Sequence, residues 1–291
     1  MSLVASCRIP DLGGPLIPDL QCHSPEEIES VSRPDTPVPI VSHHTHTDLS
    51  LCGRADMTLE AAVAAAVEQG YRTLGFCDHI HIDSITDRPA HAERLRQYKA
   101  RRDEADWPVQ VLIGGEFEVQ AKGAIVECDE ILDVCEYVVV APNHYQLDWV
   151  DSIAGTCAEV AEHELDHIET ALNWPHTNIL AHPFAGTVRE SGHDPNGMWE
   201  AADKGRIRAL LDLAQARGVA LEIQPKLWYH PERTGRVTEL IDWWLEMGGL
   251  VALGSDAHAL APLQTWTERY SEIIERFNLS AEKMWWPPSD K

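Results

Sequence analysis

The stretch Gly249-Leu250-Val251-Ala252-Leu253-Gly254-Ser255-Asp256-Ala257-His258 joins a short apolar run to two polar side chains. The run 249–252 is typical of a buried strand. Asp256 and His258 follow at the carboxyl end of that strand, two residues apart. Since carboxylate and imidazole groups both bind metal ions, this stretch predicts a pair of metal ligands at a strand end.

A similar pair stands early in the chain, where the apolar run 38–42 leads into His44-Thr45-His46. Between the two pairs, short apolar runs alternate with helical patterns. The seven predicted strands are 38–42, 73–77, 109–113, 137–141, 178–181, 219–223 and 250–253. The predicted helices are 58–69, 91–103, 129–135, 154–172, 201–217, 238–247 and 263–277.

Most of the predicted strands are apolar throughout and rich in β-branched residues, as are strands buried on both faces of a parallel sheet. The alternation of strands and helices predicts an α/β fold, with a parallel barrel rather than a sandwich. A length of 291 residues suits one such barrel. We therefore expect a barrel domain at 37–291, preceded by an extended, proline-rich N-terminal arm at 1–36.

The composition limits the classes of partner. Hydrophobic residues make up 44% of the chain and no apolar run approaches a membrane-spanning length, so we expect a soluble globular protein. The seven cysteines are odd in number and lack paired spacing, which suits a reducing compartment and predicts a cytoplasmic protein. Asp and Glu outnumber Lys and Arg by 47 to 23, a formal net charge of -24. Such a charge repels polyanions, which disfavours nucleic-acid binding.

Candidate metal ligands follow nearly every predicted strand, at the end where barrel active sites form. In chain order they are His44, His46, Asp78, His79, Glu116, His144, His182, Asp256 and His258, with Glu222 at the sixth strand. One such histidine is ordinarily structural, but five histidine-bearing strand ends at one barrel mouth favour a metal centre. Imidazole and carboxylate ligands suit Zn, Mn or Fe, and their number predicts two or three divalent ions.

The motifs around these residues occur in a fixed order: His44-Thr45-His46-Thr47, Phe76-Cys77-Asp78-His79, Gly115-Glu116, His144, Ala181-His182-Pro183 and Gly254-Ser255-Asp256-Ala257-His258. In this order they resemble the motifs of the PHP (polymerase and histidinol phosphatase) superfamily, from Val38 to about Leu260. The resemblance implies a distorted, seven-stranded TIM-like β/α barrel, in agreement with the seven strands counted above.

The resemblance also implies how the ligands are shared among the ions. The first site would be held by His44, His46 and Asp256, the second by His144 and His182 with Glu116 as the bridge, and the third by His79 and His258.

Two further residues, Cys52 and Asp78, are expected near the third site. In the family a further histidine often completes the third site, and this chain has Cys52 at that position. We favour Cys52 as a ligand, because thiolates bind zinc well. Asp78 is adjacent to His79 in the sequence, and either coordinates an ion or orients a ligand.

The implied activity is hydrolysis of a phosphate ester by a metal-bridging hydroxide, with His44, Glu116 and Asp256 at the reacting centre. The resemblance favours a phosphomonoesterase of the histidinol-phosphate or nucleotide phosphatase type, acting on a small phosphorylated substrate. Candidate phosphate contacts are Arg189, Lys226 and Arg233. Two alternatives are a phosphodiesterase or exonuclease acting on nucleotides, and a non-catalytic metal-binding regulatory module. The sequence leaves the substrate, the metal and the oligomeric state open.

A second histidine motif, His163-Glu164-Leu165-Asp166-His167, matches the His-Glu-x-x-His pattern of zinc proteases. The helical period predicts that His163 and His167 face away from a core stripe that includes Ala161 and Leu165. No Gly-x-x-His continuation follows the motif. We therefore disfavour a protease.

Overall fold

The computed structural model describes residues 38–184, 192–228, 235 and 238–287 of the chain. The predicted N-terminal arm at 1–36 lies outside these residues.

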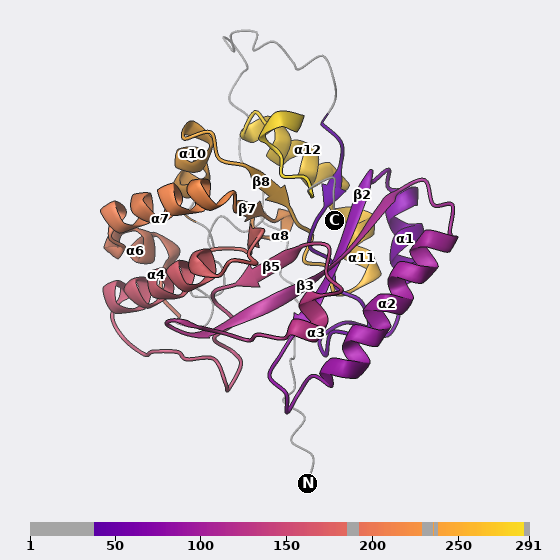
Figure 1. Cartoon of the computed structure of the whole chain (residues 1–291). Coiled ribbons are helices and arrows are strands. Elements are labelled where there is room, and N and C mark those ends of the chain that lie inside the picture. Colours follow the sequence, from indigo (N-terminus) through magenta and orange to yellow (C-terminus); the bar gives the residue numbers. More distant parts are fainter. Residues whose placement is uncertain (1–37, 185–191, 229–234, 236–237, 288–291) are drawn as a thin grey trace, which may run out of the picture. The chain divides into compact units, whose positions relative to one another are not determined.

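Seven parallel strands form the sheet, in the same order as in the sequence. They are β1 (Val41–Ser42), β2 (Thr73–Ile80), β3 (Gln110–Ala121), β5 (Val138–Ala141), β6 (Ile179–Leu180), β7 (Ala220–Ile223) and β8 (Val251–Leu253). The first and last strands also meet, because the His43 N–H donates to the Leu253 carbonyl at 2.7 Å and the Asp256 N–H donates to the His44 carbonyl at 2.7 Å. The sheet thus closes on itself with helices around it (Figure 1), which confirms the predicted seven-stranded barrel.

Strand β3 is much longer than predicted. It continues to Ala121 and pairs antiparallel with a short strand, β4 (Ala124–Ile125). The glycine pair at 114–115 and the charged side chains beyond it hide this extension in the sequence. Gly115 and Glu116 nevertheless continue the parallel pairing with β2 and β5.

The longer helices lie outside the sheet. Among the described residues, the helices are α1 (Leu59–Glu68), α2 (Arg88–Glu104), α3 (Asp129–Leu132), α4 (Cys157–Asn173), α6 (Pro195–Ala201), α7 (Lys204–Arg217), α8 (Pro225–Trp228), α10 (Thr238–Glu246), α11 (Leu260–Thr265), α12 (Thr267–Arg276) and the 3₁₀ turn η2 (Ala281–Lys283). The predicted helix 263–277 divides at Trp266 into α11 and α12.

Local capping sets where two of these helices begin. Asp203 accepts hydrogen bonds from the amides of Gly205 and Arg206, so α7 begins after it. Thr156 and Glu159 form a reciprocal capping box, so α4 begins three residues later than predicted.

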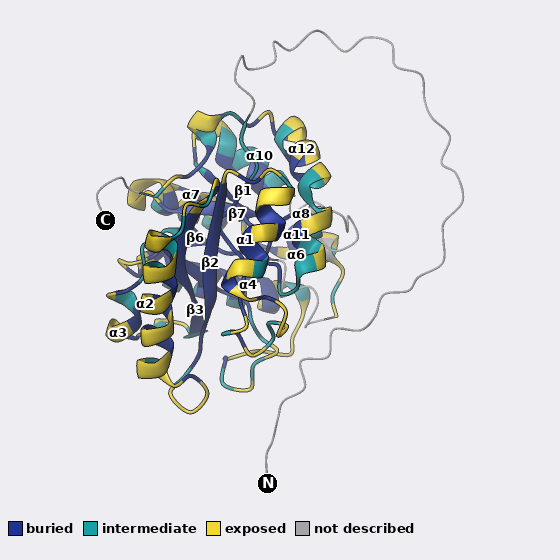
Figure 2. Ribbon diagram, turned by 90° about the vertical axis from the view of Figure 1, so that its right-hand side faces the viewer, coloured by how far each residue is buried: buried dark blue, intermediate teal, exposed yellow. Residues whose placement is uncertain are grey.

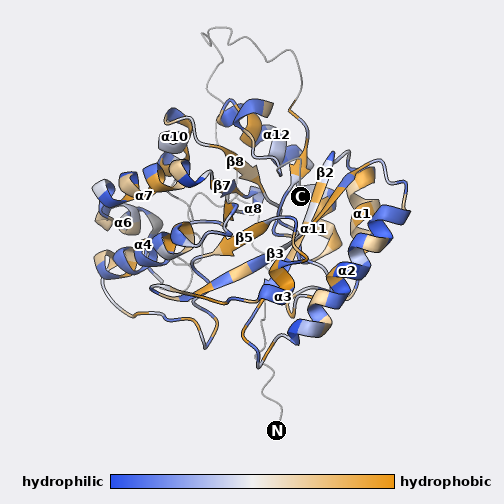
Figure 3. Cartoon of the chain, in the orientation of Figure 1, coloured by the Kyte–Doolittle hydropathy of each residue, from blue (hydrophilic) through white to orange (hydrophobic). Residues whose placement is uncertain are grey.

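The hydrophobic core has two layers, because alternate residues of a strand point to opposite faces. In β5, Val138 and Val140 pack with the helices, whereas Val139 and Ala141 face the barrel interior. The interior cluster is rich in alanine and also contains Trp285. Figure 2 shows the resulting buried strands and exposed outer helix faces, and Figure 3 shows the same division in hydropathy. None of the helices in the described part of the chain has the length and apolar character of a membrane span.

Helix α4 differs from its predicted orientation at one position. The expected core residues Ala161 and Leu165 are buried, but so is His167, with no exposed surface. The prediction that His167 faces away from the core is wrong, because the loop that follows β5 folds over that side of the helix: Pro142 accepts a hydrogen bond from His167 Nδ1 at 2.9 Å.

Candidate metal centre

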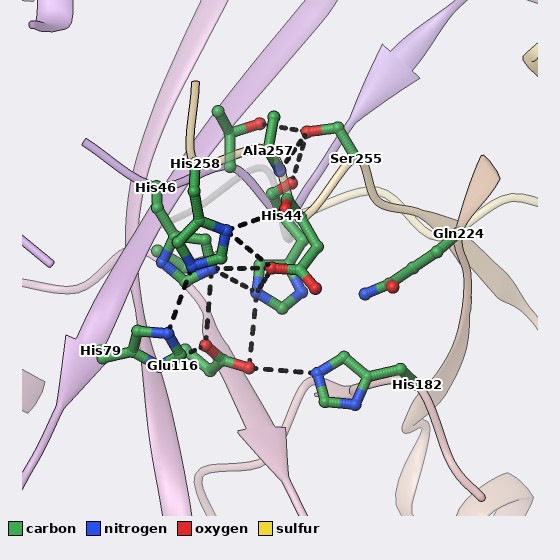
Figure 4. Close-up of polar contacts among 12 residues, drawn as sticks. His44, His46, His79, Glu116, His182, Gln224, Ser255, Ala257 and His258 are labelled. Atoms are coloured by element: carbon green, nitrogen blue, oxygen red, sulfur yellow. Dashed lines mark hydrogen bonds and ion pairs between the residues drawn. The ribbon is translucent and has the colours of Figure 1, made fainter. Parts of the chain in front are cut away.

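Most of the predicted ligands come together at the carboxyl ends of the strands, and Figure 4 shows His44, His46, His79, Glu116, His182 and His258 gathered there. They form four overlapping groups in which the ligand atoms lie within 4.8 Å of one another. The groups are His44–His46–Asp256, His44–Glu116–His182, His79–Glu116–Glu118–His144 and His46–His79–His258. Each of the three predicted sets therefore has at least two of its members in one group.

Glu116 stands at the middle of these groups. Its Oε1 lies 3.4 Å from the Nε2 atoms of both His44 and His182, and 3.9 Å from that of His144. Its Oε2 lies 2.7 Å from His79 Nδ1 and 3.6 Å from His46 Nε2. The carboxylate is fully buried, and within the described ranges neither oxygen makes a well-directed hydrogen bond. A buried carboxylate surrounded in this way fits a bridge between cations.

The imidazoles are anchored through their other ring nitrogen. The Nδ1 contacts are His44 to Glu222 Oε1 at 2.8 Å, His46 to Ser50 Oγ at 3.0 Å, His144 to Glu118 Oε2 at 2.6 Å, His182 to Asn143 Oδ1 at 3.0 Å and His258 to the Asp256 carbonyl at 3.0 Å. An acceptor at Nδ1 fixes the tautomer with its lone pair on Nε2, which is the arrangement of metal-bound histidine. The donor set therefore fits divalent metal ions.

This arrangement agrees with comparisons to known proteins. A family model of the PHP domain matches residues 42–226. The chain belongs to the PHP domain family. This match confirms the predicted resemblance to the PHP superfamily. It also confirms the predicted enzyme class, a PHP-type phosphoesterase.

Two solved structures share the fold of this PHP chain. The HisK protein of Listeria monocytogenes has a TM-score of 0.61 and 14% identity, over 79% of this chain and 99% of that one. A histidinol phosphate phosphatase of Lactococcus lactis, solved with zinc, L-histidinol and phosphate, has a TM-score of 0.56 and 16% identity, over 83% of this chain and 94% of that one. A search of curated proteins finds no significant match.

Asp256 and His182 reach the PHP centre through unusual backbone geometry. Both residues have positive φ angles, 46° and 26° respectively, a region that L-amino acids rarely adopt. Such strained positions persist where the surrounding structure holds them, and they cluster at functional sites. Here they lie directly beyond β8 and β6, and Asp256 Oδ1 lies 3.1 Å from His46 Nε2.

Lys226, predicted to contact phosphate, pairs with the other oxygen of Asp256. Burial alone would raise the pKa of Asp256, but Lys226 and His44 hold it well below its usual range. Asp256 is therefore ionised, as a metal ligand must be. The other two predicted phosphate contacts, Arg189 and Arg233, lie outside the described residues.

Sequence reasoning missed Glu118. The side chains of Glu116 and Glu118 share one face of β3, because strand residues alternate. Glu118 lies 3.0 Å from His79 Nδ1 and 2.6 Å from His144 Nδ1, so it links two candidate ligands. Burial would raise its pKa, but mainly His144 lowers it to about 2. The alternation Glu116-Phe117-Glu118 is the sequence signal that both carboxylates lie on one face of a strand. It was missed because the strand was predicted to end at residue 113.

Asp78 belongs to none of the four groups of described residues. Its oxygens accept hydrogen bonds from the Thr47 amide at 2.6 Å, the Thr47 hydroxyl at 2.7 Å and the Ser50 hydroxyl at 2.7 Å. Ser50 in turn contacts His46 Nδ1. This geometry favours the orienting role of Asp78 over coordination.

Cys52 is half-buried beside the third predicted site. Burial opposes ionisation of the thiol, but hydrogen bonds with His258 and His79 outweigh it and lower its pKa to about 6. Those two imidazoles have their Nε2 atoms 3.5 Å apart. Cys52, like Asp78, belongs to none of the four groups of described residues, so only its hydrogen bonds with His258 and His79 connect it to the third predicted site.

Proposed function

We propose that this PHP-family chain hydrolyses a small phosphate monoester with two or three divalent metal ions. The observation that carries the proposal is the convergence of imidazole Nε2 atoms on the buried Glu116, with Nδ1 of each anchored by an acceptor. When bound, the ions would supply a hydroxide nucleophile near neutral pH and neutralise the phosphoryl oxygens.

The residues of the chain hold and orient this centre. The ligands to the ions are His44, His46, Asp256, Glu116, His144, His182, His79 and His258, with Cys52 as a further ligand of the third ion. Glu222 supports two of these ligands, accepting from His44 Nδ1 at 2.8 Å and from the His182 amide at 2.9 Å. Lys226, paired with Asp256, brings a positive charge to the mouth that would attract a phosphate.

A pocket beside His79 suits a small substrate. It has a volume of about 240 Å³ and is lined by Leu49, Leu51, His79, His81, Ile85, Thr86, Asp87, Ala90, His91 and Arg94. Arg94 adds a cation to the lining of this pocket. The L. lactis relative of the same fold was solved with L-histidinol and phosphate, which supports a small phosphomonoester as the substrate class. The net charge of -24 speaks against a nucleic-acid substrate.

The test combines metal analysis with a panel of phosphoesters, before and after chelation. We expect at least two ions per chain, and activity on small phosphomonoesters that is lost with the ions and regained with Zn²⁺ or Mn²⁺. Glu116→Gln should lower both metal content and activity, whereas Glu68→Gln, at an exposed position of α1, should change neither.

Other outcomes would select the alternatives. Full activity with fewer than two ions would overturn the multinuclear site. Activity confined to diesters would favour the phosphodiesterase. A protein that binds metal but turns over no phosphoester would be a binding module.

A further inference from the structure

A second group of candidate ligands lies apart from the PHP centre, on helix α4. His163 and His167 are one turn apart on the helix, and Asp151 belongs to the loop that follows β5. The ligand atoms of these three residues lie within 4.8 Å of one another. None of the three belongs to the four groups around Glu116.

The ring of His167 is set for coordination. Its Nδ1 lies 2.9 Å from the Pro142 carbonyl, which can only accept, so Nδ1 carries the proton and Nε2 carries a lone pair. The side chain is fully buried, and Nε2 has no hydrogen-bond partner among the described residues. A buried acceptor without a donor is costly. A ring fixed by a backbone carbonyl, with its second nitrogen unpartnered, is the usual form of a histidine metal ligand.

The other two residues complete an open site beside that nitrogen. The ring of His163 lies 4.4 Å from that of His167. Its Nε2 donates to the Asp151 carbonyl at 3.1 Å, which leaves Nδ1 with the lone pair that a metal ion would use. The ring of Tyr145 packs 5.4 Å from both imidazoles. Asp151 is exposed and His163 half-buried, so an ion can enter from solvent.

The glutamate of the motif takes no part in this group. Glu164 is buried and accepts hydrogen bonds from Asn143 Nδ2 at 3.0 Å and from the Phe184 amide. In a His-Glu-x-x-His protease that residue is the general base beside the metal. Its engagement elsewhere argues for a binding site without hydrolytic chemistry.

We propose that Asp151, His163 and His167 bind one divalent transition-metal ion, such as Zn²⁺, at a site separate from the PHP centre. Two imidazoles and a carboxylate are a normal zinc donor set, and water would fill the remaining position. The ion joins α4 to the loop 142–151, which carries the candidate ligand His144. Its role is to brace that loop.

Zinc binding at equilibrium tests the site. The full chain is dialysed against buffered Zn²⁺ and its zinc content measured for the wild type, His163→Ala and Asp151→Ala. Each variant should bind one ion fewer than the wild type. The control His176→Ala, at an exposed position outside the group, should bind as many ions as the wild type. Unchanged zinc content in both variants would overturn the proposal.

Hydrogen exchange then locates the ion. Zinc should slow amide exchange across 142–151 in the wild type and in His176→Ala. In His163→Ala the protection around His144, which the PHP centre supplies, should remain, whereas the protection of 148–151 should be lost. Zinc-dependent protection around β1 and β8 should remain in every protein, because the PHP centre is intact. Zinc protection of 148–151 in His163→Ala equal to that in the wild type would assign the effect to the PHP centre and refute the second site.

Discussion

His44 and His46 present their Nε2 atoms to each other at a distance of 3.0 Å. His44 Nδ1 contacts the Glu222 carboxylate, and His46 Nδ1 contacts the Ser50 hydroxyl. Burial lowers the pKa of both rings. In His44 the charges of Cys77, Glu222 and Glu116 outweigh burial, so the pKa of His44 lies well above its ordinary value. The pKa of His46 stays well below its ordinary value. A proton held by His44 satisfies this contact in the chain alone, and a divalent ion bound by both Nε2 atoms would take the place of that proton.

Metal removal should therefore destabilise the protein as well as inactivate it. An ion that binds only the folded state adds about 2.7 kcal/mol when its concentration is 100 times its Kd. For a domain of this size we expect chelation to lower Tm by roughly 5 to 10 °C per such ion. Calorimetry with and without EDTA measures the shift, and re-addition of Zn²⁺ should reverse it. An unchanged Tm would show that the cluster binds no ion in the folded protein.

Glu222→Gln should weaken metal binding without removing a ligand. Glu222 accepts from His44 Nδ1 and from the His182 amide, so it orients two imidazoles at once. Loss of such a supporting carboxylate typically lowers metal affinity about 10- to 100-fold. Competition with a chelator of known affinity measures the change. Glu246→Gln, at an exposed position of α10, is the matched control and should keep wild-type affinity.

Gly254→Ala should disrupt the same corner of the site. A Cβ at position 254 would collide with the Glu222 carboxylate and lie 2.8 Å from the Cβ of His44. The overlap should cost about 1 to 3 kcal/mol of stability and displace both side chains. We expect lower metal content and activity in the purified variant. In Gly197→Ala the nearest atom to the new methyl group lies 3.4 Å away, an ordinary contact distance. This control should therefore keep the metal content and the activity of the wild type.

Much of the fold and centre could be predicted because the signals are local. Apolar runs followed by ligand residues mark the strands and the barrel mouth. Glu118 could not be placed, since a charged, glycine-containing segment does not look like a strand until its neighbours pair with it. His167 was misjudged for a related reason: helical periodicity reports the face toward the sheet, and the covering loop from Pro142 comes from another part of the chain.

Cys52→Ala should remove about one metal ion per chain if Cys52 is a ligand of the third site. The thiol forms hydrogen bonds with His79 and His258, and its lowered pKa of about 6 favours the thiolate that binds metal. Cys52→His should restore the ion, since imidazole is also a good ligand. Elemental analysis measures the metal content of both variants. Cys157→Ala, on α4, controls for the loss of a thiol. Equal metal content in wild type and Cys52→Ala would make Cys52 a bystander.

Glu164→Gln should change how stability depends on pH. Burial raises the pKa of Glu164 to about 8 from an ordinary value of 4.5, so at neutral pH the folded protein holds a proton that the unfolded chain releases. Between these two values the free energy of unfolding should fall as pH rises, by up to about 1.4 kcal/mol per pH unit. Glutamine keeps the oxygen that accepts from Asn143 and the Phe184 amide, and it cannot ionise.

The variant and the wild type should thus be similar near pH 5, and the variant should become the more stable protein as the pH approaches 8. Urea denaturation across this range, in excess chelator so that metal binding does not contribute, measures the difference. Glu68→Gln removes an exposed carboxylate and should keep the wild-type slope. Parallel pH profiles for wild type and Glu164→Gln would mean that Glu164 is ionised in the folded protein, in which case its buried charge must be balanced by a group other than Asn143.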